Sequence, residues 1–146
     1  MGMNHPGCVN RLFEIGKEIG FAPAKRSYGK MYSTGNPDCV WYYPAKGKGQ
    51  KILRKIAQGD RYRNLPFIAF EVAGTEGEKA LRGSIMSLQL TNAAASIIVL
   101  IGKSDTPKFK SYLKKLVGRY SYMRLRIWTE NDVKKLYKIA MQDHKK

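Results

Sequence analysis

The sequence predicts an α/β protein with a mixed β-sheet flanked by helices. Apolar runs of strand composition alternate with segments of helical periodicity, in the order α-β-β-β-α-β-α-β-α. The chain has 146 residues, 43% hydrophobic and 26% charged, which suffices for one domain with its own core. No internal repeat or low-complexity linker divides it. We therefore expect residues 1–146 to form a single domain.

The first helix is predicted to begin near Pro6, because proline is favoured in the first turn. It should end at Gly20, since glycine is a common helix C-terminal signal. Residues 21–28 have the composition of a weak strand. A turn at 34–37 then leads into a clear strand over 38–43.

The next strand, over 66–72, is almost wholly apolar and follows a polar connection over 44–64. Thr75 and Glu78 then have the spacing of a capping box. A helix is therefore expected from about residue 76 to about residue 94.

The C-terminal part continues the alternation with a core strand over 96–102 and a helix that opens at Pro107. The strand over 122–128 alternates, and Thr129 with Asp132 resembles another helix start. The alternation places Met123, Leu125 and Ile127 inward, and Tyr122, Arg124, Arg126 and Trp128 outward.

Charge is the most informative property of the composition. Lys and Arg number 27 against 11 Asp and Glu, a formal net charge of +16, which favours a polyanionic partner such as nucleic acid. The basic residues recur along the chain, so a generally basic, solvated surface is the alternative interpretation. The connection over 44–64 begins and ends at two candidate strands, so we expect it to clamp a nucleic-acid backbone. The predicted nucleic-acid contacts are Lys46, Lys48, Lys51, Arg54, Lys55, Arg61, Arg63, Arg124 and Arg126. For Arg124 and Arg126, protection of a sheet edge against aggregation is an equal alternative.

Other classes of protein are disfavoured. The sequence has no run of about 18 apolar residues and no signal peptide at its start, so we expect a soluble, intracellular, cytoplasmic protein with no membrane partner. Cys8 and Cys39 are too few for a disulfide framework. His5 and His144 lie at opposite ends of the sequence, so we do not expect a thiolate or imidazole metal site.

One carboxylate interrupts the apolar stretch LPFIAFEVAG, residues 65–74. Strand alternation places Glu71 on one face with Ala69 and Ala73, and Phe70 and Val72 on the other. A buried carboxylate without a partner costs several kcal/mol. Glu71 is therefore either half of a structural ion pair with an arginine or a metal ligand or catalytic acid.

A second carboxylate, Asp38, lies where a turn enters the preceding strand. From adjacent strands, Asp38 and Glu71 could project into one cleft and hold Mg²⁺, which takes one or two carboxylates together with waters and phosphate oxygens. Such an ion would activate water and offset charge on a phosphate. Glu14 or, second, Glu18 in the first helix could supply a further oxygen.

These residues resemble the PD-(D/E)xK nuclease superfamily, whose restriction-endonuclease-like fold includes archaeal Holliday-junction resolvases and small phage and plasmid nucleases. The motifs are LFEIGKEIGF, PDCVWYY, FEV and IIVLIG, in that order, and the resemblance extends from about Arg11 to Trp128. It implies that Pro37 and Asp38 are the motif PD, that Glu71 is the second acid, and that Glu14 is the helix acid. It also implies Mg²⁺ or Mn²⁺ as cofactor, DNA as substrate, and a homodimer as one possible assembly.

The sequence departs from the superfamily pattern at the motif lysine. That position falls on Ala73. Related families place the lysine on the following helix, where this chain offers Lys79 or Arg82.

Two main hypotheses follow. In the first, the protein is a Mg²⁺-dependent DNA endonuclease or phosphodiesterase. Its metal ligands are Asp38 and Glu71, and its catalytic residues are Asp38, Glu71, Glu14 and Lys79. In the second, it is a catalytically impaired, nuclease-like nucleic-acid-binding protein or a subunit of a DNA-processing complex. A third interpretation is an interaction protein whose charge serves solubility or nonspecific RNA contact.

Overall fold

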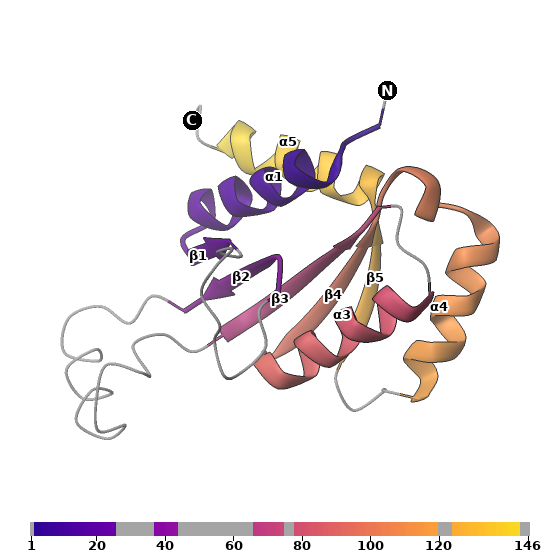
Figure 1. Cartoon of the computed structure of the whole chain (residues 1–146). Coiled ribbons are helices and arrows are strands. Elements are labelled where there is room, and N and C mark those ends of the chain that lie inside the picture. The colour runs from indigo at the N-terminus through magenta and orange to yellow at the C-terminus, as the bar shows by residue number, and fades with distance from the viewer. Residues whose placement is uncertain (1, 26–36, 44–65, 75–77, 120–123, 144–146) are drawn as a thin grey trace, which may run out of the picture.

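A computed structural model describes residues 2–25, 37–43, 66–74, 78–119 and 124–143. The described part of the chain has the predicted order α-β-β-β-α-β-α-β-α, with one 3₁₀ turn, η2, added (Figure 1). The elements are α1 (His5–Glu18), β1 (Ala22–Lys25), β2 (Cys39–Tyr42), β3 (Pro66–Ala73), α3 (Glu78–Thr91), β4 (Ala95–Leu100), η2 (Gly102–Ser104), α4 (Pro107–Arg119), β5 (Leu125–Thr129) and α5 (Glu130–Asp143).

The five strands form one mixed sheet in the order β1-β2-β3-β4-β5. The pairs β1–β2 and β2–β3 are antiparallel, whereas β3–β4 and β4–β5 are parallel. Parallel neighbours need a crossover connection, and α3 and α4 supply the two crossovers. We call the edge where β3, β4 and β5 end, and where β2 begins, the carboxyl edge. The opposite edge is the amino edge.

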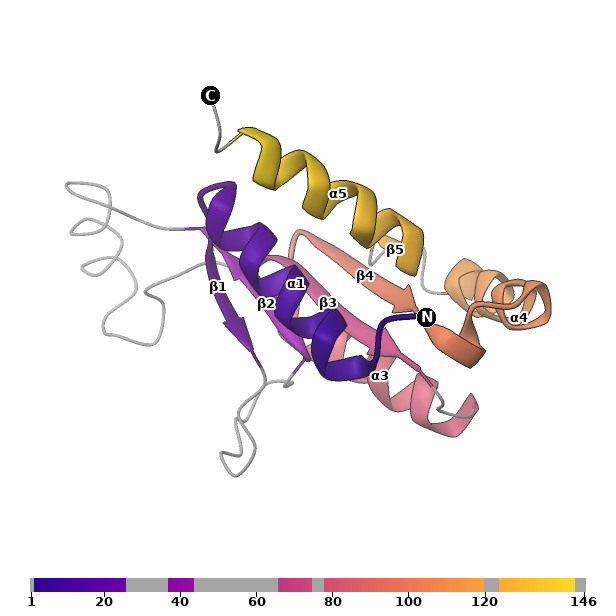
Figure 2. The same cartoon turned by 90° about the horizontal axis from the view of Figure 1, so that it is seen from above.

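Helices cover both faces of the sheet, so the predicted flanked mixed sheet is confirmed. Figures 1 and 2 show α1 and α5 together over one face, with α3 and α4 on the other. Two apolar clusters correspond to these layers, and β3 contributes to both. Phe70 and Val72 belong to the cluster under α1 and α5, whereas Ala69 and Ala73 belong to the cluster under α3 and α4. This is the predicted alternation, and it places Glu71 on the α3 and α4 face.

Helix α1 begins and ends within two residues of the prediction. Asn4 is the N-cap, and its side-chain oxygen accepts a hydrogen bond of 2.8 Å from the Gly7 amide. Pro6 lies in the first turn, where its missing N–H costs nothing. After Glu18 the chain leaves the helix through Gly20, whose φ of +101° favours glycine.

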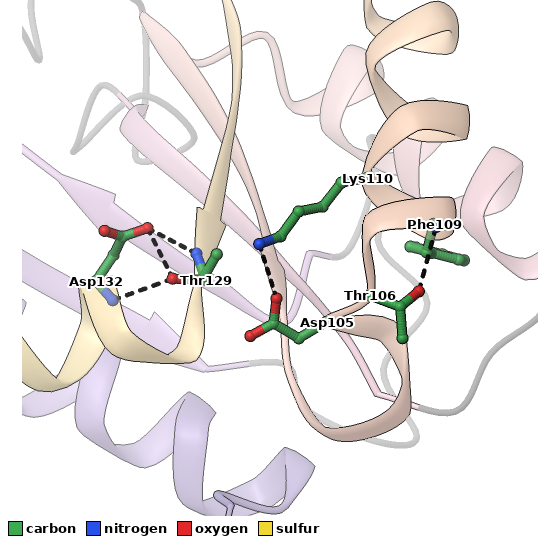
Figure 3. A network of polar contacts seen from close by, with 6 residues as sticks. All are labelled: Asp105, Thr106, Phe109, Lys110, Thr129 and Asp132. Atoms are coloured by element: carbon green, nitrogen blue, oxygen red, sulfur yellow. Dashed lines mark hydrogen bonds and ion pairs between the residues drawn. The ribbon is translucent and has the colours of Figure 1, made fainter.

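The predicted cap of α5 is also confirmed. The Thr129 amide donates to Asp132 Oδ2 over 2.7 Å, and the Asp132 amide donates to Thr129 Oγ1 over 3.4 Å (Figure 3). These reciprocal bonds satisfy two donors at the helix start. Helix α4 begins in a similar way, because the Phe109 amide donates to Thr106 Oγ1 over 3.2 Å.

The outward assignment of Trp128 is wrong. Its half-buried ring packs against the cluster under α1 and α5, with its centroid 5.6 Å from that of Phe70. The reason is that α5 folds back over this face of β5, so both faces of the strand are covered. Leu125 is buried and Arg126 is exposed, as predicted.

No helix in the described ranges is long and apolar enough to span a bilayer.

Helix α1 approaches β2 closely at Gly16. The Trp41 indole donates from Nε1 to the Leu12 carbonyl over 2.9 Å, and a Cβ on Gly16 would lie 2.5 Å from the same Nε1. Trp41 is 2% exposed, so its ring has no open space into which it could move. Glycine at position 16 is therefore required by packing.

We predict that Gly16→Ala lowers the free energy of unfolding by about 1–3 kcal/mol, because the added methyl displaces the Trp41 ring. Urea denaturation measures the change. Gly83→Ala in α3 is the matched control, since a Cβ there would meet nothing within 4 Å. The control should be neutral or stabilising by up to about 1 kcal/mol. Equal effects of the two substitutions would contradict the packing argument.

Candidate functional site

All five strands and the start of α1 meet at the carboxyl edge, where the last residue of β1, Lys25, pairs with Cys39. The parallel strands β3, β4 and β5 end there, and the antiparallel strand β2 begins there. The start of α1 reaches the same edge, as the contact of His5 with Asp38 shows. In open sheets of this kind, the carboxyl ends of parallel strands are the usual place for a ligand site.

The two predicted acidic residues occupy neighbouring strands at this edge. Cys39 pairs with Phe70, and Asp38 and Glu71 each lie one residue beyond this last pair of the ladder. Both residues are buried, with 4% of Asp38 and 6% of Glu71 exposed. The structure therefore brings the predicted pair together at adjacent backbone positions.

The Asp38 carboxylate is held by the backbone of β3. Its Oδ2 accepts a hydrogen bond of 2.8 Å from the Val72 amide. Strand β2 begins only at Cys39, so the side chain of Asp38 satisfies a ladder donor that the backbone of β2 does not reach. A buried amide left unsatisfied costs about 1–3 kcal/mol, so this contact is structural whatever else Asp38 does.

Sequence reasoning missed His5. Its Nε2 lies 3.2 Å from Asp38 Oδ2, and about a third of its side chain (34%) remains exposed. The contact joins residues 33 positions apart, and no spacing rule predicts it. The sequence does show His5 next to Pro6 at the predicted start of the first helix, but this position does not indicate which residue His5 contacts.

The start of α1 is tied to α5. The Met3 amide donates to Glu130 Oε1, and Lys134 Nζ forms an ion pair of 3.5 Å with the same oxygen. Arg11 lies over the Tyr137 ring with its Cζ 5.0 Å from the centroid. These contacts fix the segment that carries His5.

The turns that follow β3 and β4 are joined to each other. Ser104 Oγ donates to the Gly74 carbonyl over 2.7 Å, and the Ile101 amide donates to the Ala73 carbonyl over 3.0 Å. Ser104 is buried. Two hydrogen bonds therefore hold the ends of β3 and β4 together at the carboxyl edge.

The structure does not bring Glu14 to this site. Glu14 is exposed, on the side of α1 opposite the buried residues Leu12 and Ile15. It follows His5 by nine residues, or about 13–14 Å along the helix axis.

The position of the motif lysine is apolar in the structure. Ala73 is 2% exposed and packs in the cluster under α3 and α4. Arg82 is exposed on α3, and Lys79 belongs to the same helix, but its side chain lies outside the described residues.

Most of the predicted nucleic-acid contacts lie outside the described residues. This holds for Lys46, Lys48, Lys51, Arg54, Lys55, Arg61 and Arg63. The two ends of their connection are at the amino edge, where Tyr42 pairs with Pro66. Pro66 is five residues, or about 17 Å, from Glu71.

The two described basic candidates, Arg124 and Arg126, are exposed at the start of β5. Arg124 has a φ of 51° and lines a cavity of about 130 Å³ between the end of α3 and the start of β4. This cavity belongs to the amino edge.

Among the described residues, few oxygen donors lie together near the carboxyl edge. In the described part of the chain, no group of three or more His, Cys, Asp or Glu side chains is arranged to hold a metal ion. Mg²⁺ needs only one or two protein carboxylates and keeps several waters, so the pair Asp38 and Glu71 is still a fitting donor set.

The chain matches no protein-family model, no curated protein and no solved structure. A candidate function therefore depends on the chemistry of these residues.

The two cysteines lie close to the site but are inert. Cys8 and Cys39 are both free and fully buried. Burial raises the pKa of each thiol from 9.0 to about 12, and the negative charge of Asp38 contributes to both shifts. The thiols are therefore protonated at neutral pH, and they are neither nucleophiles nor ready metal ligands.

We predict that the protein loses stability above pH 9. The unfolded thiols release protons at about pH 9, whereas the folded thiols keep them up to about pH 12. Their contribution is therefore full below pH 9 and declines as the pH rises toward 12, by about 1.4 kcal/mol per pH unit for each thiol. Urea denaturation between pH 8 and pH 10.5 measures the slope.

Cys39→Ala supplies the control. Because it removes one of the two thiols, the unfolding free energy of the variant should fall less steeply as the pH rises. An unchanged slope in the variant would contradict the assignment. Ellman's reagent should leave both thiols of the folded protein unmodified at pH 8.

Proposed function

We propose that the protein is a metal-dependent phosphodiesterase that acts on DNA, with Asp38 and Glu71 as the ligands of Mg²⁺ or Mn²⁺. The observation that carries the proposal is the register of β2 and β3, which puts two buried acidic residues at neighbouring backbone positions of the carboxyl edge. The net charge of +16 supplies the attraction for a polyanionic substrate.

The residues at the edge have distinct roles in this proposal. Asp38 is oriented before any ligand arrives, because the Val72 amide and the His5 ring both contact its Oδ2. Glu71 lies between the small side chains of Ala69 and Ala73, which limits crowding beside its carboxylate. The bound cation would supply Lewis-acid stabilisation of charge on the phosphate and a more acidic water.

His5 is a positioning residue. A hydrogen bond from Nε2 to Asp38 Oδ2 would restrict rotation of the carboxylate, much as outer hydrogen bonds orient metal ligands elsewhere. The ring is held by the capped start of α1 and by the contact of Met3 with Glu130.

A cation is still needed in place of the lysine that Ala73 replaces. Helix α3 packs on the face of the sheet that carries Glu71, and it brings Lys79 and Arg82 in its first two turns. We propose that one of these two supplies the positive charge.

A second function is favoured by two specific observations. Asp38 already has a structural task as the partner of the Val72 amide, and Ala73 is a buried apolar residue. Both fit a nuclease-like protein that binds nucleic acid without cleaving it, alone or as a subunit of a DNA-processing complex.

We predict that Asp38→Asn and Glu71→Gln each reduce Mg²⁺- or Mn²⁺-dependent cleavage at least 100-fold. The reason is that a neutral amide is a poor ligand for these cations. Asp38→Asn keeps an oxygen acceptor for Val72, so its melting temperature should stay close to that of the wild type. Asp38→Ala should also lose about 1–3 kcal/mol of stability. The assay uses labelled duplex, single-stranded, flap and four-way-junction DNA.

Glu14→Gln is the control, because it removes an exposed carboxylate from the same molecule and should leave the cleavage rate unchanged. Cleavage that survives both Asp38→Asn and Glu71→Gln would contradict the metal site. A wild type that binds DNA in a salt-sensitive way but cleaves none of the four substrates would establish the second function.

We further predict that either Lys79→Ala or Arg82→Ala lowers the cleavage rate about 100-fold, as expected for the loss of a charge that stabilises the transition state. The other substitution should have little effect. Single-turnover kinetics at saturating Mg²⁺ distinguish the two. Full activity in the double variant would show that neither residue replaces the motif lysine.

A further inference from the structure

Helix α4 has a charge distribution unlike that of the other described helices. It carries five basic residues and no acidic one: Lys108, Lys110, Lys114, Lys115 and Arg119. By contrast, α1 carries two basic and two acidic residues, and α5 carries three of each. A helix that is merely solvated needs no such imbalance, and among the described helices the excess positive charge is concentrated on α4.

Four of the five basic residues of α4 are exposed, and Lys110 is half-buried. Leu113 and Leu116 are buried in the cluster under α3 and α4, and they fix the inward side of the helix. Lys108, Lys115 and Arg119 are exposed and lie within about 40° of one another around the axis. They form a line about 16 Å long, which we call the α4 stripe.

In the part of the chain that the structure describes, one acidic side chain forms an ion pair with α4. Asp105 precedes the helix, and its carboxylate pairs with Lys110 Nζ over 3.1 Å (Figure 3). That pair neutralises Lys110, which is not part of the stripe. Within the described ranges, no acidic side chain pairs with Lys108, Lys115 or Arg119.

The α4 stripe begins near the candidate site. Helix α4 follows η2, whose Ser104 is hydrogen-bonded to Gly74, three residues after Glu71. The chain thus leads directly from the carboxyl edge into the helix (Figure 1). From Lys108 the stripe runs toward Arg119 and the segment that precedes β5.

We infer that the outward face of α4 binds the phosphate backbone of a nucleic acid, with Lys108, Lys115 and Arg119 as phosphate contacts. A strand of B-DNA advances about 3.4 Å per phosphate, so the stripe spans about five nucleotides. Membrane binding is disfavoured, since the exposed large apolar side chains of the described residues lie on other elements. The inference rests on the proposed function for the class of partner, but it does not require cleavage.

The test compares two variants with the same net charge. The first removes the α4 stripe by Lys108→Gln, Lys115→Gln and Arg119→Gln. The second removes three exposed charges from the opposite layer by Lys17→Gln, Lys135→Gln and Lys138→Gln. Both lower the formal charge from +16 to +13. Binding to a fluorescein-labelled 20-base-pair duplex is followed by anisotropy in EDTA at 50–300 mM NaCl.

The α4 variant should bind at least tenfold more weakly at 0.1 M salt, and the slope of log K against log[salt] should shrink by about 2.7. The control variant should stay within about threefold of the wild type. Melting temperatures confirm that both variants are folded.

Equal losses in the two variants would overturn the inference, since net charge alone would then explain binding. Failure of the wild type to bind the duplex would overturn it as well. So would displacement of the labelled duplex by polyglutamate as effectively as by unlabelled DNA of the same charge. The outcome is separable from that of the proposed function, because binding is measured without metal. If the wild type cleaves DNA and the α4 variant binds the duplex as tightly as the wild type, the proposed function stands and the inference fails. If binding depends on the α4 stripe but no DNA is cleaved, the inference stands and the proposed cleavage activity fails.

Discussion

The double pairing of β3 is the constraint on which the rest of the structure depends. It is antiparallel to β2 and parallel to β4, so the beginning of β2 and the ends of β1, β3, β4 and β5 meet at one edge. The parallel half requires crossover helices, and these cover one face while α1 and α5 cover the other. With both faces covered, β3 must be apolar on both, and Glu71 is the exception. Glu71 lies near the end of β3, so this buried carboxylate is at the edge that the strand pairing creates.

Much of this fold could be predicted because local and global signals agree. Alternation along β3 and the capping box of α5 both depend on neighbouring residues, and both are confirmed. The neighbouring backbone positions of Asp38 and Glu71 were also within reach, since β2 and β3 are consecutive strands. Trp128 was misassigned because its environment depends on a helix that returns over the strand from further along the chain. The contact of His5 with Asp38 could not be predicted, because it depends on how α1 is docked.

The candidate site and the basic surface illustrate two different limits of sequence reasoning. A count of charges predicts a polyanionic partner but cannot say which basic residues share a surface. The fold supplies that information by dividing the helices between two layers, of which the layer with α1 and α5 is close to charge balance. Among the described helices, the excess of basic residues is on α3 and α4. Asp38 shows the second limit, since its residue type fits a metal ligand and a backbone cap equally well, and its bond from the Val72 amide bears only on the second task.

The contact between α1 and α5 has a consequence for biosynthesis. The two helices come from opposite ends of the described chain, yet they form one layer, with Met3 bound to Glu130 and Arg11 over Tyr137. During translation, the apolar underside of α1 and the face of the sheet beneath it remain without their cover until residues up to Asp143 have left the ribosome. Val133 of α5 is therefore among the last core residues to be synthesised, and the face of the sheet that it covers stays exposed to aggregation for longest.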